Sequence, residues 1–347
     1  MMAAVFHKNE GEGGEIMLED VSIPYIANEA QVKLKITSCG ICGTDLKIAS
    51  GGHPAKDNTI LGHEFVGIID EVGENIRDLD VGDKVAVDPN EYCGYCKYCR
   101  SGLTNLCEYM AKGTTFGIFQ NGGFAKYCIL PRKTLYKLPD DFDMTTAALI
   151  EPLACAIHCH NQADVKESDV VVIIGAGPMG SIIESVIRTH PIKKLISIEI
   201  NDWRREKALE LGADHTINPK TQDVKKEIMY LTNNNGVDVI IDAVGASDTF
   251  DMATKIWSYG ARLVCFGQDT RAEAFLKPND IVRFQRRIMG SYIYNSRDFL
   301  DAIELTANRK IDAYKLITQE ITINDLITRG FELMKSKKCV KVIVHPN

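Results

Sequence analysis

The stretch VVVIIGAGPMG, residues 170–180, decides the fold of this chain. Its first five residues form a continuous apolar run, which is typical of a buried parallel strand. Three glycines follow with the spacing GxGxxG: Gly175 allows a tight turn, Gly177 lets a ligand approach the backbone, and Gly180 lets a helix pack closely on the strand. The stretch therefore predicts a dinucleotide-binding turn that opens a helix. The alternative is a turn of the same shape that binds nothing.

The segments after this stretch alternate between strands and helices. Ser181–Thr189 places its isoleucines and valine on one helical face, and Asp202–Leu211 has the length of a second helix, ending at a glycine. Apolar strands are predicted at Lys194–Ile200, Val237–Ala243 and Arg262–Phe266. This alternation predicts the α/β class, with a doubly wound parallel sheet.

An acidic residue, Glu199, ends the second of these strands. A carboxylate there accepts hydrogen bonds from the adenosine ribose hydroxyls and repels a 2′-phosphate, which favours NAD over NADP. Arg204 and Arg205 lie just beyond it and could receive such a phosphate, so NADP stays open as the alternative. The residues predicted to bind the dinucleotide are Gly175, Gly177, Pro178, Met179, Gly180, Glu199 and Arg204.

The chain before residue 150 has a different pattern. Short alternating or apolar stretches, broken by glycine and turn residues, indicate a β-rich, barrel-like region. Strands are predicted there at Gln31–Ile36, Phe65–Val72, Asp83–Val87 and Phe124–Leu130. After residue 290 the pattern predicts helices at Phe299–Leu305 and Leu326–Met334 and a strand at Val340–Val344. The pattern does not assign this tail to either region.

The net charge and the cysteine count limit the class of protein. The 347 residues carry a net charge of −7, which argues against nucleic acid or an anionic membrane as a partner. No apolar run reaches the roughly 20 residues of a membrane span, and no export signal is visible at the N-terminus. We therefore expect a cytoplasmic protein. In that compartment clustered cysteines bind metals or take part in catalysis more often than they form disulfides.

Four of the 11 cysteines form one cluster, Cys93-x2-Cys96-x2-Cys99-x7-Cys107. Four thiolates without a histidine predict a closed, tetrahedral zinc site that fixes the loop and leaves no position for a substrate. An iron–sulfur cluster and a nucleic-acid-binding zinc ribbon are the alternatives, and the acidic charge argues against the second. The cysteines interpreted as small core residues are Cys39, Cys128, Cys155, Cys159, Cys265 and Cys339.

A second, dispersed set combines different ligand types. It consists of Cys42 in the segment CGICGTD, His63 and Glu64 in LGHE, and Glu151 in IEP. One thiolate, one imidazole and one or two carboxylates leave an open position on a metal, as catalytic zinc sites do. Each residue alone also fits a plain structural role. The residues by themselves therefore leave a catalytic metal and ordinary turns equally open.

These motifs, in this order, resemble those of the zinc-containing medium-chain dehydrogenases. The matching segments are GICGTD (40–45), GHE (62–64), the four-cysteine loop, EP (151–152) and the Rossmann glycines. Glu151 stands where other alcohol dehydrogenases of the family have a cysteine, so the chain is most similar to the polyol and threonine branch. The resemblance implies a GroES-like catalytic domain, residues 1–153 and 291–347, and a Rossmann domain, residues 154–290.

The resemblance also implies a role for each residue of the dispersed set. It gives the catalytic zinc the ligands Cys42, His63, Glu64 and Glu151. With the structural zinc this makes two Zn²⁺ per chain, and Asp45 orients the catalytic site. Thr44 takes the proton of the substrate hydroxyl, whose carbon gives a hydride to the nicotinamide of NAD. Lys47 stands where the family often has a histidine at the end of this proton relay, so the last proton acceptor is left open.

The resemblance makes the expected substrate a small polar molecule with a secondary hydroxyl: a polyol, a sugar alcohol or its phosphate. An amino alcohol such as threonine is one alternative, and a family member that has lost catalysis and only binds is another. Candidate substrate contacts are His53 in a glycine-rich loop, Tyr294, Asn295 and, more weakly, Asn121. The resemblance further implies a homodimer or homotetramer.

Overall fold

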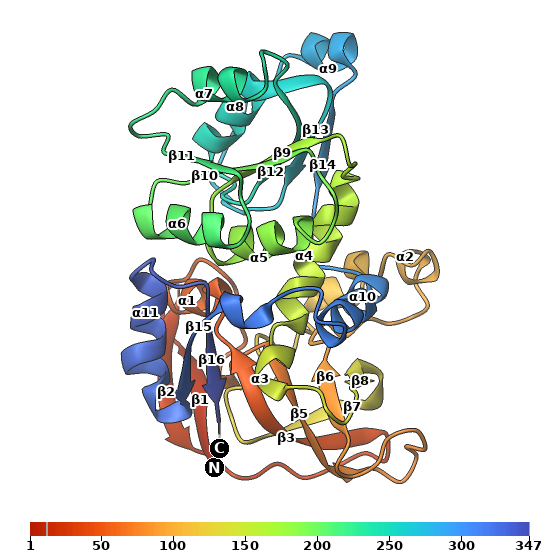
Figure 1. Cartoon of the computed structure of the whole chain (residues 1–347). Helices are drawn as coiled ribbons and strands as arrows, with labels where there is room; N and C mark the ends of the chain where they lie inside the picture. The colour runs from red at the N-terminus through yellow and green to blue at the C-terminus, as the bar shows by residue number, and fades with distance from the viewer. Residues whose placement is uncertain (12, 347) are drawn as a thin grey trace. The chain divides into compact units, whose positions relative to one another are not determined.

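Figure 1 shows the computed structural model, which describes residues 1–11 and 13–346. The described residues form two compact units. Unit 1 contains Met1–Ala154 and the chain from Asn295 onward, and unit 2 contains Cys155–Tyr294. The boundary at residue 154 falls within helix α4 (Ile150–Ala163).

Unit 2 is built on six parallel strands in the order β11-β10-β9-β12-β13-β14. The strands are β9 (Val170–Ile174), β10 (Lys194–Ile198), β11 (His215–Ile217), β12 (Val237–Asp242), β13 (Trp257–Cys265) and β14 (Arg287–Gly290). The helices are α5 (Pro178–Ile187), α6 (Asp202–Glu210), α7 (Val224–Leu231), α8 (Ser247–Ile256) and α9 (Pro278–Phe284). The chain adds strands first on one side of β9 and then on the other, which confirms the predicted doubly wound sheet.

The sequence of β9 explains its central place in this sheet. All five of its residues are buried, and Val172 and Ile174 belong to the apolar core of the unit. The neighbouring β10 ends at Ile198, two residues earlier than predicted, because the Glu199 side chain binds loop N–H groups there. The strand β13 begins at Trp257, earlier than predicted, and pairs with β12 across an irregularity in register.

Unit 1 contains two sheets. One has the order β2-β1-β4; the other has the order β15-β16-β3-β5-β6-β8, with β7 paired to β3. The strands are β1 (Met2–Lys8), β2 (Gly14–Asp20), β3 (Gln31–Gly40), β4 (Thr59–Ile60), β5 (Glu64–Val72), β6 (Lys84–Val87), β7 (Tyr127–Pro131), β8 (Leu135–Lys137), β15 (Ile317–Thr322) and β16 (Lys341–His345). The α-helices other than α4 are α1 (Gly43–Ala49), α2 (Lys97–Arg100), α3 (Met144–Ala147), α10 (Ser296–Ala307) and α11 (Glu332–Lys335).

The last strand, β16, returns to the β-rich unit. It pairs antiparallel with β3, with Ile343 opposite Gly40 and Val344 opposite Cys39. The tail that the sequence pattern left unassigned therefore lies in unit 1, and it ends beside the strand that leads into α1. The helix predicted at Leu326–Met334 is instead a π-helical turn, Leu326–Phe331, followed by α11.

The strand predicted at Phe124–Leu130 begins only at Tyr127. The Phe124 N–H donates to the Leu61 carbonyl oxygen over 2.9 Å, and the Phe124 carbonyl oxygen accepts the Ala4 N–H over 2.9 Å. Phe124 therefore connects to the segment around β1 and β4 before the chain joins β3.

Candidate active site and metal centres

The dispersed set of predicted ligands meets at the end of β3. Cys42 is the residue before α1, and its backbone N–H donates to Asp45 Oδ2 over 2.9 Å. His63 and Glu64 lie where the chain enters β5, after a turn in which Gly62 has a φ of +91°. The possible ligand atoms of Cys42, His63 and Glu64 lie within 4.8 Å of one another.

This three-residue group fits a divalent metal. His63 is 7% and Glu64 1% exposed, and His63 Nδ1 and Glu64 Oε2 have no hydrogen-bond partner among the described residues. Burial lowers the pKa of His63, but the charges of Cys42 and Asp45 outweigh it and raise that pKa to about 10. The negative groups around the imidazole thus favour a cation. Sulfur, nitrogen and oxygen ligands suit Zn²⁺, and three protein ligands leave one position open.

Asp45 lies next to the imidazole of His63. Its Oδ1 is 3.6 Å from His63 Nδ1, and its side chain is fully buried. Burial raises the pKa of Asp45 to about 6, and the charge of His63 opposes this rise. A carboxylate beside the second nitrogen of a ligand histidine orients the ring, which is the role that the resemblance implies for Asp45.

Glu64 also forms a buried ion pair, which sequence reasoning missed. Its Oε1 contacts Nζ of Lys341 on β16, and both side chains are 1% exposed. Lys341 Nζ also lies 3.4 Å from the Ile41 carbonyl oxygen. Burial lowers the pKa of Lys341, but Glu64 and then Cys42 raise it above its usual value, so the lysine stays charged. A signal was present in the sequence, because Lys341 is the one charged residue within Val340–Val344.

The other predicted members of the set lie around this group. Thr44 Oγ1 is 3.5 Å from Cys42 Sγ, and Lys47 is exposed in the last turn of α1. Glu151, in the first turn of α4, is 9% exposed and lies outside the group of three. Burial, followed by the charge of Glu64, raises the pKa of Glu151 to about 7. The two carboxylates are therefore close enough for their charges to interact.

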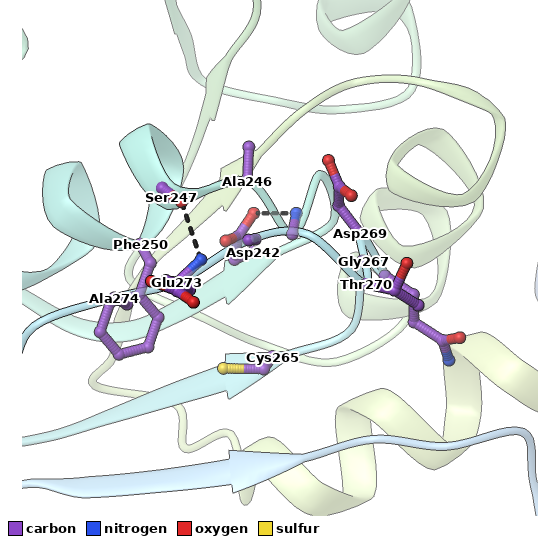
Figure 2. Close-up of a pocket in the computed structure, with 13 residues that line it drawn as sticks. Asp242, Ala246, Ser247, Phe250, Cys265, Gly267, Asp269, Thr270, Glu273 and Ala274 are labelled. Atoms are coloured by element: carbon purple, nitrogen blue, oxygen red, sulfur yellow. Dashed lines mark hydrogen bonds between the residues drawn. The ribbon is translucent and has the colours of Figure 1, made fainter. Parts of the chain in front are cut away.

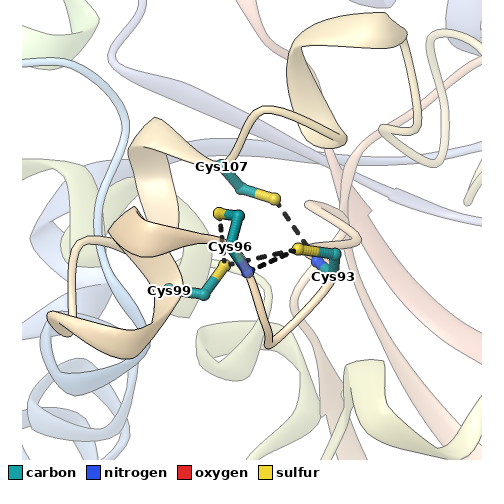
Figure 3. A group of neighbouring side chains, drawn as sticks. All are labelled: Cys93, Cys96, Cys99 and Cys107. Carbon is teal, nitrogen blue, oxygen red and sulfur yellow. Dashed lines mark hydrogen bonds between the residues drawn. The ribbon is translucent and has the colours of Figure 1, made fainter.

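The four-cysteine loop brings its sulfur atoms toward a common centre (Figure 3). All four Sγ atoms lie within 4.8 Å of one another, with 3.6 Å between Cys96 and Cys99 and 4.0 Å between Cys93 and Cys99. A tetrahedron with Zn–S bonds of about 2.3 Å has sulfur–sulfur edges of about 3.8 Å. The Cys93 N–H donates to Cys107 Sγ over 3.3 Å, and backbone N–H groups lower the pKa of Cys96 to about 6. This geometry suits a closed zinc site.

The glycine turn after β9 leaves space that side chains would fill. Gly175 has a φ of +93°, and a Cβ added at Gly180 would lie 1.9 Å from the Gly175 carbonyl oxygen. Gly177 immediately precedes α5, whose first residues are Pro178 and Met179. The helix therefore begins at the turn, and no side chain among the described residues caps it there, an arrangement that fits a pyrophosphate.

Glu199 and Arg204 flank this turn. Glu199 Oε2 accepts the Ala176 N–H over 3.0 Å, and its Oε1 accepts the Asn201 N–H over 2.8 Å. A Cβ added at Gly177 would lie 3.5 Å from Arg204 Nη1, and Arg204 Nε is buried without a hydrogen-bond partner among the described residues. An unpartnered guanidinium nitrogen beside the glycines fits an anionic ligand.

A pocket of about 360 Å³ opens where β12 and β13 end (Figure 2). Its lining includes Asp242, Phe250, Cys265 and Glu273. Because the strands are parallel, this is the same edge of the sheet as the glycine turn, where ligands of such folds bind. The sequence did not predict this pocket, and Cys265, interpreted there as a core residue, is only partly buried. Cys155 is also partly exposed, whereas the other four cysteines of that group are buried: Cys39, Cys128, Cys159 and Cys339.

Three of the candidate substrate contacts are buried or bound to nearby backbone groups. Asn295 Oδ1 accepts the N–H groups of the first turn of α10 and caps that helix, and Tyr294 is only 2% exposed. Asn121 Oδ1 accepts the Ile60 N–H over 3.1 Å. Asn121 lines a separate cavity of about 460 Å³, to which none of the predicted metal ligands contributes.

Comparison with known proteins places these features in a family. Residues 28–140 match the alcohol dehydrogenase GroES-like domain, and residues 178–308 match the zinc-binding dehydrogenase family. A sorbitol dehydrogenase from Halalkalibacterium halodurans is 34% identical over 322 residues, which are 91% of this chain and 92% of that protein.

Solved structures agree over the full length. Galactitol-1-phosphate dehydrogenase from Escherichia coli is 28% identical with a TM-score of 0.90, and the match covers 100% of each chain. The 2R,3R-butanediol dehydrogenase from Bacillus subtilis is 30% identical with a TM-score of 0.89, covering 100% of this chain and 99% of that one. No helix among the described residues is long and apolar enough to cross a membrane. These matches confirm the predicted resemblance and fold class: the chain belongs to the zinc-containing medium-chain dehydrogenases, in their polyol branch.

Proposed function

We propose that this chain oxidises a secondary hydroxyl of a polyol or sugar alcohol and transfers the hydride to NAD. The observation that carries the proposal is the buried group of Cys42, His63 and Glu64, whose mixed ligand atoms lie within 4.8 Å of one another. The glycine turn with Glu199 supplies the second requirement, a dinucleotide site. Similarity over nine-tenths of the chain to a sorbitol dehydrogenase supports a polyol as the substrate class.

The residues of unit 1 have separate roles in the proposed reaction. Cys42, His63 and Glu64 would hold a zinc ion, whose charge favours the loss of the substrate's hydroxyl proton. Asp45, with Oδ1 3.6 Å from His63 Nδ1, would orient the His63 ring, and the Thr44 hydroxyl, 3.5 Å from Cys42 Sγ, would take up that proton and pass one on. NAD, when bound, accepts the hydride. Glu151 adds a carboxylate whose raised pKa allows it to exchange between charged and neutral forms near neutral pH.

The electrostatics of the dinucleotide site favour NAD over NADP. The Glu199 carboxylate, 6% exposed, is fixed by two backbone N–H groups, so a 2′-phosphate would meet a negative charge that cannot easily move away. Arg205 is already engaged, because its guanidinium binds the Glu199 carbonyl oxygen over 2.9 Å and also contacts Asp202. The 3.5 Å approach of Arg204 Nη1 to a Cβ added at Gly177 supports a role for Arg204 in binding the pyrophosphate.

We further propose two zinc ions per chain, one on the Cys42 group and one on the four-cysteine loop. The second site has four sulfur ligands and therefore no position for a substrate. We also propose a cytoplasmic location, because the proposed four-cysteine zinc site needs thiolates that stay reduced, as they do in that compartment.

We propose that the protein is a homodimer or homotetramer, because one edge strand of the unit 2 sheet is open. Among the described residues β14 pairs only with β13. Apolar side chains stand exposed on and near it: Phe275 at 83%, Val282 at 77% and Ile288 at 37%. An open strand edge with apolar neighbours is suited to pairing with a second copy of the chain. Sedimentation of the purified protein as a monomer would contradict this proposal.

A polyol phosphate is the second candidate substrate. The exposed cation Lys47, one turn after Thr44 on α1, is suited to a phosphate, and galactitol-1-phosphate dehydrogenase shares the fold over its full length. Free polyols, their phosphates and threonine should be compared by NADH formation, with and without a chelator. We expect chelator-sensitive turnover with a polyol or its phosphate and a zinc content near two per chain. Turnover that is insensitive to metal removal, or preference for threonine, would overturn the proposal.

A further inference from the structure

The cavity of about 460 Å³ that Asn121 lines is bounded by strands of both sheets of unit 1. Val5 and His7 of β1 line it from one sheet, and Tyr127 and Ile129 of β7 line it from the other. Residues two apart on a strand point to the same face, so each strand turns one face toward the cavity. The volume lies in the range of about 300–1,000 Å³ that is typical of small-molecule sites.

The lining combines apolar side chains with groups that form hydrogen bonds. Ile60 and Phe116 are 7% and 5% exposed and supply apolar surface. Asn121 Oδ1 accepts the Ile60 N–H over 3.1 Å, which fixes the amide and leaves the Nδ2 hydrogens to donate. The Tyr127 hydroxyl can both donate and accept, and Lys33 Nζ lies 4.9 Å from the centroid of the Tyr127 ring. Donors and acceptors beside an apolar wall suit hydroxyl groups on a carbon chain.

The charges of the lining argue against an ionic ligand. Among the described residues that line the cavity there is no lysine or arginine, so a phosphate would find no side-chain cation to bind. The one carboxylate among them is that of Glu19, and its Oε1 already lies 2.5 Å from His7 Nε2. A cationic ligand would have to compete with this contact. The lining therefore favours a neutral molecule with several hydroxyl groups.

The wall of the cavity is continuous with the turn that leads to the metal ligand His63. Gly123, two residues after Asn121, donates its N–H to the Gly62 carbonyl oxygen over 2.7 Å. A Cβ added at Gly117 would lie 2.2 Å from the same oxygen, so the loop packs backbone against backbone on this turn. A ligand that binds Asn121 and restrains the loop would therefore also restrain the turn before His63.

We propose that this cavity is a second binding site, which takes a neutral polyhydroxy molecule such as the substrate polyol and steadies the turn before His63. The choice of a polyol rests on the proposed function above. None of the predicted metal ligands lines the cavity, so the site would bind the polyol without oxidising it. Binding there and the state of the metal group would be coupled, because the ligand stabilises the loop arrangement that it binds.

Nuclear magnetic resonance of the zinc-loaded protein without NAD tests the site. Sorbitol should shift the backbone amide signals of residues 127–129 in a saturable way, and sorbitol phosphate and the amino analogue of sorbitol should bind more weakly. Tyr127→Phe and Asn121→Asp, which keeps the acceptor for the Ile60 N–H, should each weaken sorbitol binding about 2- to 10-fold, as expected for the loss of one hydrogen bond. The exposed control variants Tyr230→Phe and Asn279→Asp should bind as the wild type does.

Hydrogen exchange of the same protein tests the link to His63. Bound sorbitol should slow exchange of the Gly123 amide and leave that of Ile217 on β11 unchanged. Absent shifts at residues 127–129, or wild-type affinity in both cavity variants, would overturn the site. Unchanged exchange at Gly123 with sorbitol bound would overturn the link to His63. A wild type that binds sorbitol in this cavity but oxidises no polyol would overturn the proposed function alone.

Discussion

Removal of Lys341 should destabilise unit 1 far more than removal of an exposed lysine. In Lys341→Met the Glu64 carboxylate, 1% exposed, loses its ion-pair partner, and its Oε2 already has no hydrogen-bond partner among the described residues. Breaking a buried ion pair from one side costs about 3–5 kcal/mol. For a unit of this size each kcal/mol lowers Tm by about 2–4 °C. The expected loss is therefore about 6–20 °C in the metal-free protein.

Thermal unfolding followed by circular dichroism, with and without Zn²⁺, measures this loss. The matched control is Lys335→Met, whose partner Glu332 forms a pair at 59% and 62% exposure. Such a pair contributes about 0–1 kcal/mol, so Tm should change by less than about 4 °C. The double variant Lys341→Met/Glu64→Gln should recover part of the loss, because no charge is then left buried. Equal Tm values for Lys341→Met and Lys335→Met would refute the reasoning.

Four further outcomes are expected. Cys42→Ser should abolish turnover while circular dichroism and NAD binding stay normal; wild-type activity in this variant would contradict the catalytic zinc. Glu199→Ala should raise the NADP-to-NAD ratio of kcat/KM by about tenfold or more, since one opposed charge contact is worth about 1.4 kcal/mol. An unchanged ratio would refute the ribose role. Cys99→Ser should lower the zinc content from two per chain to one and reduce Tm; a normally stable but inactive variant would count against a structural site. Glu184 is fully buried, and burial raises its pKa to about 8. The folded protein therefore holds this proton at pH values where the unfolded chain has lost it, so Glu184 makes stability fall as pH rises from about 4.5 to 8. Glu184→Gln should flatten the Tm–pH curve over that range, and a curve parallel to the wild type would exclude this cause.

The parts of the site that are contiguous in sequence could be predicted from spacing alone. The glycine turn of residues 175–180 and the four cysteines of residues 93–107 each lie within one short segment, so local geometry decides them. Cys42 follows β3, whereas His63 and Glu64 lie at the start of β5, and they meet only because β3 pairs with β5. Predicting this group therefore required the family resemblance.

Other features depend on contacts that spacing does not reveal. Lys341 reaches Glu64 across 277 residues of sequence, through the pairing of β16 with β3. For Asn295 the local sequence also indicated a helix cap, which competed with a substrate role. Asn295 and Asp298, three residues apart, form a capping box, and both side chains bind backbone N–H groups at the start of α10. Asparagine is used both to bind substrates and to cap helices, so the residue type alone could not decide between these two roles.

The return of β16 to β3 has a consequence for synthesis of the protein on the ribosome. Residues 155–294 form a contiguous unit that can fold as soon as they emerge, whereas unit 1 needs strands from both ends of the sequence. Until β16 is released, Glu64 and the ligands beside it lack their countercharge. Unit 1 can therefore complete its ligand group only after the end of the chain has been released, when unit 2 can already have folded.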